Sequence, residues 1–106
     1  MKDISKYQGI FPAFYACYDK EGKVDAQAVR ALARYLLDKG VKGLYVGGSS
    51  GECIYQSVAE RKQTLEAVMA EVGGKLTVIA HVACNNTADS RELAAHAESL
   101  GVDAIA

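Results

Sequence analysis

Leu76-Thr77-Val78-Ile79-Ala80-His81-Val82 is a nearly all-apolar run that lies between two stretches of helical periodicity. A strand with one face in water alternates apolar and polar residues, whereas this run stays apolar at most consecutive positions. Such a run is typical of a strand buried on both faces, as in a parallel sheet surrounded by helices. The sequence therefore predicts an α/β fold.

The segments before this run continue the alternation of strand and helix. Residues 57–60 match a capping box that opens a helix to about Val72, and Gly73-Gly74 closes that helix. Residues 41–46 predict the strand that precedes it. An earlier helix is expected to be capped by Asp25, whose carboxylate can accept a free helix amide, and to end at Gly40.

The two ends of the chain each supply one further strand. Residues 9–15 predict a first strand that starts or kinks at Pro12, because proline cannot donate to a ladder. After the run quoted above, Thr87 is expected to cap a helix that stops at Gly101, and residues 102–106 begin a fourth strand. The resulting order, βαβαβαβ, predicts parallel pairing through right-handed crossovers.

The repeat of roughly 30 residues has the size of one unit of a (β/α)8 barrel, which needs about 250 residues in all. We therefore expect residues 1–106 to form the N-terminal, incomplete part of a single TIM (β/α)8 barrel domain, with about the first four strands and three helices. The pattern alone is equally compatible with an open flavodoxin-like sheet that has helices on both faces. Half a barrel also leaves two unpaired sheet edges.

Composition excludes several classes of protein. Hydrophobic residues make up 50% of the chain and charged residues 24%, as in soluble globular domains. The 12 basic and 13 acidic residues are interspersed, so no surface for nucleic acid is expected. No apolar run has the roughly 18 residues of a membrane span, and the amino terminus lacks the apolar core of a signal peptide. Three cysteines without CxxC spacing fit reduced thiols, so we expect a cytoplasmic protein that does not bind membranes.

The loop Gly47-Gly48-Ser49-Ser50-Gly51-Glu52 carries the clearest indication of chemistry. It follows a strand, and parallel α/β folds place their sites at the carboxyl ends of strands. Glycines allow close approach of the backbone, while the serines offer hydroxyl donors beside exposed amides. The loop predicts capture of a small carboxylate or phosphate, and a flexible surface loop is the alternative. It matches neither a Walker A loop nor a G-x-G-x-x-G motif, and we expect no cofactor.

The strand Gly43-Leu44-Tyr45-Val46 and the loop after it resemble a motif of one enzyme family. The motif is the G-[ST]-[ST]-G-E stretch of the N-acetylneuraminate lyase and dihydrodipicolinate synthase family of pyruvate-dependent class I aldolases. Leu-Tyr-Val-Gly here, and residues 79–84 on the next strand, lean toward the lyases. The resemblance extends from residue 9 to residue 106.

The resemblance implies a TIM barrel and a mechanism. In this family a lysine on the sixth strand forms a Schiff base with the keto carbon of pyruvate, and the imine accepts electrons while a neighbouring carbon–carbon bond forms or breaks. Carried over to this sequence, Ser49 is the catalytic hydroxyl of a proton relay and Ser50 binds the pyruvate carboxylate. Gly48 and Gly51 shape the loop, and Ala13 lines the pocket. The lysine and the relay tyrosines are expected outside this sequence, so the chain alone is expected to be inactive.

Three functions remain open from the sequence. The first choice is a Schiff-base lyase that acts on pyruvate and a 2-oxo sugar acid, most like N-acetylneuraminate lyase, in a homo-oligomer such as a tetramer. The second is a dihydrodipicolinate synthase that condenses pyruvate with aspartate semialdehyde in lysine biosynthesis. The third is a non-catalytic half barrel that self-associates and keeps an anion site at Ser49 and Ser50. Tyr15, Tyr18 and Tyr55 are candidates for an interface or for ordinary packing.

The other polar residues near the predicted site have ordinary explanations. His81, Cys84 and Cys53 are too few for a metal site and are expected to be a packed histidine and inert thiols. Glu52 is expected to hold its loop through backbone amides. Four lysines at helix ends, strand starts or a helix face are expected to be solvated rather than catalytic: Lys39, Lys42, Lys62 and Lys75.

Overall fold

The structure is a computed structural model that describes residues 3–106. Within that range one parallel sheet has the strand order β1-β2-β3, with β1 (Gly43–Val46), β2 (Thr77–Ala80) and β3 (Ala104–Ile105). The α-helices alternate with the strands: α1 (Ala26–Asp38), α2 (Val58–Val72) and α3 (Thr87–Leu100). The short 3-10 helices are η1 (Ser5–Tyr7), η2 (Ser49–Gly51) and η3 (Cys53–Tyr55).

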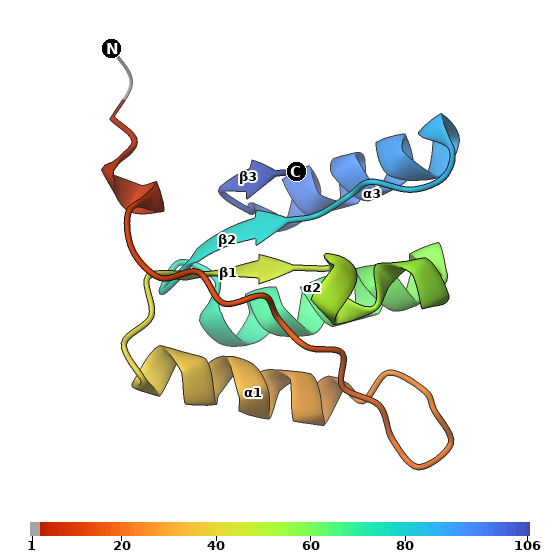
Figure 1. Cartoon of the computed structure of the whole chain (residues 1–106), viewed down its shortest axis with the longest axis horizontal. Helices are drawn as coiled ribbons and strands as arrows, with labels where there is room; N and C mark the ends of the chain where they lie inside the picture. Colours follow the sequence, from red (N-terminus) through yellow and green to blue (C-terminus); the bar gives the residue numbers. More distant parts are fainter. Residues whose placement is uncertain (1–2) are drawn as a thin grey trace.

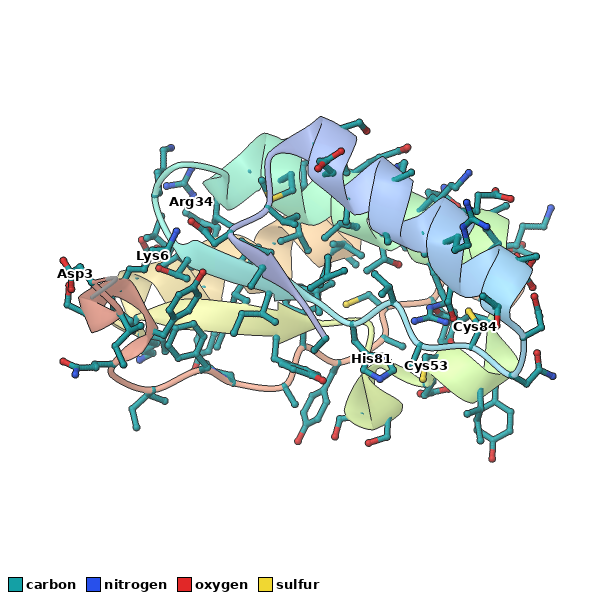
Figure 2. All side chains as sticks on the ribbon, turned by 90° about the horizontal axis from the view of Figure 1, so that it is seen from above. Asp3, Lys6, Arg34, Cys53, His81 and Cys84 are labelled. Atoms are coloured by element: carbon teal, nitrogen blue, oxygen red, sulfur yellow. The ribbon has the colours of Figure 1, made fainter. Side chains whose placement is uncertain are left out.

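The α-helices lie on one face of the sheet, with α2 between α1 and α3 (Figures 1 and 2). The strands follow one another in chain order. A flavodoxin-like sheet reverses its strand order at a switch point and so places helices on both faces. The sequential order and the one-sided cover are therefore those of a partial (β/α)8 barrel, and the predicted α/β fold class is confirmed.

The hydrophobic core lies between the sheet and these helices. Successive strand residues point to opposite faces, and those on the helix side are almost fully buried: Leu44, Val46, Val78 and Ala80. The other face of β2 differs from the prediction, because Thr77 and Ile79 are only partly buried. No α-helix among residues 3–106 packs on that face.

The strand predicted at residues 9–15 is not a regular strand. The segment runs beside β1 (Figure 1) and forms a single parallel bridge between Ala13 and Tyr45. The Phe14 amide donates to the Tyr45 carbonyl at 2.9 Å, and the Tyr45 amide donates to the Pro12 carbonyl at 3.0 Å. Because Pro12 has no amide hydrogen, the ladder is interrupted there. The described chain thus has three strands and one extended segment where the sequence predicted four strands.

Helix starts mostly follow the predicted caps. The Asp25 carboxylate accepts from the amide three residues further on at 3.1 Å. Ser57 and Glu60 form the predicted capping box, with side chain to amide distances of 3.1 and 2.9 Å. The Thr87 cap is wrong: Asn86 caps α3, because its side-chain oxygen accepts from an amide of the first turn at 2.8 Å.

Candidate active site

The serine pair lies at the carboxyl end of β1, where the sequence predicts a site. The strand ends at Val46, and η2 begins at Ser49 after two glycines. Cys53, His81 and Cys84 lie at the same end of the sheet (Figure 2). Because barrels bind their ligands at the carboxyl ends of strands, this end is the candidate active site.

Gly48 and Gly51 of the loop each pack closely against a neighbouring segment of the chain. A Cβ on Gly48 would lie 2.8 Å from Cε1 of Tyr45, and one on Gly51 would lie 3.0 Å from the carbonyl oxygen of Phe14. The Gly48 carbonyl accepts from the amides of Gly51 and Cys53 at 3.0 and 3.3 Å. A larger residue at either position would require the loop or its neighbour to move, and the loop-shaping role of both glycines stays a prediction.

Both serines present donors without partners at the surface. Ser49 and Ser50 are exposed, and neither hydroxyl forms a hydrogen bond within residues 3–106. Their amides lie in the first turn of η2 and likewise donate to no carbonyl of the described chain. Hydroxyls and amides on consecutive residues can together bind one carboxylate.

Ala13 lies on the face of the sheet that the helices leave uncovered. Its bridge to Tyr45 puts it in register with Ile79 on β2 and Ala104 on β3. The next residue, Phe14, is 2% exposed and belongs to the core, whereas Ala13 is exposed. Because adjacent extended residues point to opposite sides, Ala13 faces the side that a barrel interior occupies.

Glu52 holds the loop in a different way from the one predicted. Its Oε1 accepts from the Tyr18 hydroxyl at 3.3 Å, and Nε2 of Gln56 donates to the same hydroxyl at 3.0 Å. Its backbone has φ of +61°, a left-handed value that no other non-glycine residue among residues 3–106 shows. The expected contact with backbone amides is wrong, because a tyrosine that lies 34 residues away in the sequence supplies the donor.

A cavity of about 450 Å³ adjoins the serine loop without including either serine. It lies between the start of α2 and the loop after β2, and Cys53, Arg61, His81 and Cys84 are among the residues that line it. The cysteines are free thiols, as predicted. Within residues 3–106 no group of three or more His, Cys, Asp or Glu side chains could hold a metal ion, and no helix there combines the length and apolar character of a membrane span.

Arg61 is a residue beside the site that the motif does not reveal. Its side chain is 8% exposed, which makes it the only buried charged residue of the described chain. The guanidinium donates to the carbonyls of His81 at 2.8 Å, Ala83 at 2.9 Å and Gly47 at 3.4 Å. The helical periodicity of residues 58–72 could have identified Arg61 as buried, because it is four residues before Leu65 and so lies on the same buried face of α2.

Three of the four lysines considered in the sequence lie at the end of the sheet opposite the serine loop. Lys42 and Lys75 precede β1 and β2, so they lie at the opposite end of the sheet, and Lys39 follows α1. Lys62 lies near the start of α2 and forms an exposed ion pair with Glu92 at 2.6 Å, which is compatible with the predicted surface position. Lys39, Lys42 and Lys75 are not placed to react with a ligand at the loop.

Comparisons with known proteins agree with this geometry. Residues 6–106 match the Dihydrodipicolinate synthetase family. The chain is 67% identical to the N-acetylneuraminate lyase of Mediterraneibacter gnavus over 106 residues, which is all of this chain and 34% of that protein. A solved structure of Ruminococcus gnavus sialic acid aldolase, a catalytic lysine mutant, matches with a TM-score of 0.98 and 67% identity over 99% of this chain and 34% of that chain.

A more distant structure carries a ligand. YagE, a dihydrodipicolinic acid synthase family protein of E. coli K12 in complex with pyruvate, has a TM-score of 0.87 and 30% identity over 92% of this chain and 33% of that chain. The chain thus spans about a third of the length of these relatives. Because the family match covers nearly every residue and the fold of the relatives is reproduced, the chain belongs to the Dihydrodipicolinate synthetase family.

Proposed function

We propose that the chain contributes the carboxylate-binding part of the active site of an N-acetylneuraminate lyase, a class I aldolase that forms an imine with a 2-oxo acid. The observation that carries the proposal is the exposed pair Ser49 and Ser50, whose hydroxyls and amides have no hydrogen-bond partner within residues 3–106. The 67% identity to the Mediterraneibacter gnavus lyase, over every residue of this chain, supports the lyase rather than the synthase.

The loop suits a small carboxylate that carries a neighbouring keto group. Hydrogen bonds to an ionised acceptor are roughly twice as strong as those between neutral groups. In this proposal Ser50 and the loop amides hold the carboxylate of pyruvate, and the close packing of Gly48 on Tyr45 and of Gly51 on Phe14 shapes the loop. The keto carbon, one bond away, then projects toward the uncovered face of the sheet, where the methyl group of Ala13 leaves room for it.

Imine formation also requires an amine that this loop lacks. The related Ruminococcus gnavus structure is described as a catalytic lysine mutant, whereas Lys42 and Lys75 of this chain precede the strands at the far end of the sheet. We assign the amine to the part of the barrel that accompanies this sequence in its relatives. The imine withdraws electrons from the carbon–carbon bond beside it as that bond breaks, and Ser49 takes part in the proton relay.

A homo-oligomer is part of the same proposal. Large apolar side chains near the site are exposed: Tyr15 at 68%, Ile54 at 79% and Tyr55 at 77%. Large apolar side chains at the surface are candidates for contacts between subunits. Sedimentation of the complete barrel is expected to give a species larger than one subunit, and a monomer at micromolar concentration would remove this part of the proposal.

A chimera tests the proposed function. This sequence replaces the matching third of the Mediterraneibacter gnavus lyase, which completes the barrel. We expect the chimera to release pyruvate from N-acetylneuraminate and to take a covalent label from pyruvate and borohydride. A chimera that unfolds cooperatively but neither releases pyruvate nor takes the label would refute the proposal. Condensation of pyruvate with aspartate semialdehyde in place of cleavage would favour the synthase.

The 106-residue chain alone provides the matching control. We expect no label on it from pyruvate and borohydride, because Lys39, Lys42 and Lys75 lie away from the serine loop and Lys62 is paired with Glu92. Stable labelling of the isolated chain would place the reactive amine within this sequence and contradict that part of the proposal.

A further inference from the structure

Arg61 connects the carboxyl ends of β1 and β2. Its Nη2 donates to the carbonyls of His81 and Gly47, and its Nη1 donates to the carbonyl of Ala83 and to Sγ of Cys84. Gly47 directly follows β1, and His81 directly follows β2. Carbonyls at these positions lie beyond the last residues of their strands, so a side chain must satisfy them if they are buried.

The bonding of this buried cation is unusual because no carboxylate takes part. Arg61 is 8% exposed and forms no ion pair within residues 3–106, and its Nε has no hydrogen-bond partner. Removing a charge from water is costly, and the hydrogen bonds to the backbone carbonyls offset that cost here. The same bonds also fix where the ends of β1 and β2 lie relative to each other, which is a geometric role beside the stabilising one.

The peptide after Gly47 leads directly to the serine pair. Gly47 has φ of +85°, and a Cβ on it would lie 3.2 Å from the carbonyl oxygen of His81. Glycine has the widest conformational freedom of any residue, so this peptide can rotate unless its carbonyl is held. Rotation there would turn the start of η2, which carries Ser49 and Ser50.

We propose that Arg61 is a positioning residue: its guanidinium fixes the Gly47 carbonyl against the end of β2, so that Ser49 and Ser50 meet the carboxylate of the 2-oxo acid. The proposal rests on the proposed function for its effect on catalysis. Its structural part, the orientation of the loop, does not depend on which reaction the barrel performs.

Kinetic constants of the chimera test the positioning role. Arg61→Met keeps the length of the side chain but removes every donor. We expect the KM for N-acetylneuraminate to rise roughly 10- to 100-fold, as for a lost hydrogen bond to a charged group, and kcat to change far less, because carboxylate binding acts on ground state and transition state alike. Arg61→Lys keeps the charge but lacks the planar guanidinium group, so its KM should lie between those of wild type and Arg61→Met.

Two matched variants separate positioning from stability. Val29→Ala removes a buried core side chain of α1 that is 0% exposed, so it should lower the Tm and leave the KM unchanged. Arg34→Met removes an arginine that pairs with Glu71 on the surface, and it should change neither the Tm nor the KM appreciably. A KM for Arg61→Met that equals wild type, or a KM for Val29→Ala that rises as much as that of Arg61→Met, would overturn the proposal.

Chemical rescue adds a readout that lost stability cannot imitate. Arg61→Ala opens space beside the cavity of about 450 Å³, which guanidinium ion can enter. Millimolar guanidinium chloride should lower the KM of Arg61→Ala toward wild type and should not lower that of Val29→Ala. If the ion has no effect on a folded Arg61→Ala chimera, the guanidinium group does not position the loop.

Amide spectra of the chain itself keep the two proposals distinguishable. In ¹H–¹⁵N NMR spectra of the 106-residue chain, Arg61→Met should shift the Ser49 and Ser50 amide signals, and Arg34→Met should not. Unmoved serine signals would overturn the positioning role even if the chimera is active. An inactive wild-type chimera with shifted serine signals in Arg61→Met would instead overturn the proposed function alone.

Discussion

Gly48→Ala gives a sharp test of the packing beneath the serine loop. The added Cβ would lie 2.8 Å from Cε1 and 3.2 Å from Cδ1 of Tyr45. Gly48 has φ of −84° and ψ of −163°, which alanine adopts without strain, so the steric conflict is the whole cost. Since carbon atoms in contact lie at least about 3.5 Å apart, the loop and the ring must separate by roughly 0.7 Å.

Overpacking of this kind costs about 1–3 kcal/mol of unfolding free energy. For a domain of about 100 residues each kcal/mol lowers the Tm by roughly 4–8 °C. The Tyr45 backbone is held by its ladder to β2 and by the bridge to Ala13, so the conflict is expected to be relieved by movement of the loop together with the partly buried ring. We therefore expect the loss of stability to be accompanied by a higher KM for N-acetylneuraminate in the chimera.

Two further variants make the Gly48 test specific. Gly74→Ala meets no atom within 4 Å but has φ of +80°, so it should cost about 1–2 kcal/mol without any effect on the KM. Tyr45→Leu removes Cε1, so Gly48→Ala should cost less in that background than in wild type. Urea unfolding and steady-state kinetics measure both effects. The steric reasoning is refuted if Gly48→Ala is as stable as wild type. It is also refuted if Gly48→Ala lowers the free energy of unfolding as much in the Tyr45→Leu background as in wild type.

Two other predictions concern a helix cap and a thiol. Ser57→Ala removes one half of the capping box of α2 and should cost about 1 kcal/mol in urea unfolding; an equal loss in the exposed control Ser99→Ala would contradict the role of the cap. Burial, with a smaller contribution from the Asp25 carboxylate, raises the pKa of the Cys17 thiol. Because only the thiolate reacts, alkylation of Cys17 by iodoacetamide should rise at higher pH than that of free cysteine, and a coincident pH profile would contradict the assignment.

Local features were predictable from the sequence because the interacting groups are close along the chain. The Asp25 cap and the Ser57–Glu60 box each join groups three residues apart. The Thr87 cap failed for a related reason, because Asn86 beside it is also a good capping residue and only backbone geometry decides between them. The interruption of the first segment at Pro12 is local too, because proline has no amide hydrogen, whereas the single bridge that remains to β1 joins residues far apart along the chain.

The candidate site also has features that were predictable from the sequence and features that were not. The serine pair was found because a short motif follows an apolar strand, and its position at the carboxyl end of β1 is confirmed. The contact between Glu52 and Tyr18 spans 34 residues. Arg61 bonds chiefly to backbone carbonyls, and a carbonyl has the same chemistry in every residue, so no residue pattern marks its partners. Such contacts become visible only once the fold brings the strand ends together.

The affinity of the chimera for pyruvate tests most directly whether the serine loop holds the carboxylate. A hydrogen bond to a charged group is worth about 1.5–3 kcal/mol, or roughly 10- to 150-fold in a dissociation constant. The rate of borohydride trapping as a function of pyruvate concentration gives this constant. We predict a rise within that range for Ser50→Ala and none for the exposed control Ser99→Ala. Equal affinities of wild type and Ser50→Ala would contradict the assignment of the loop to the carboxylate.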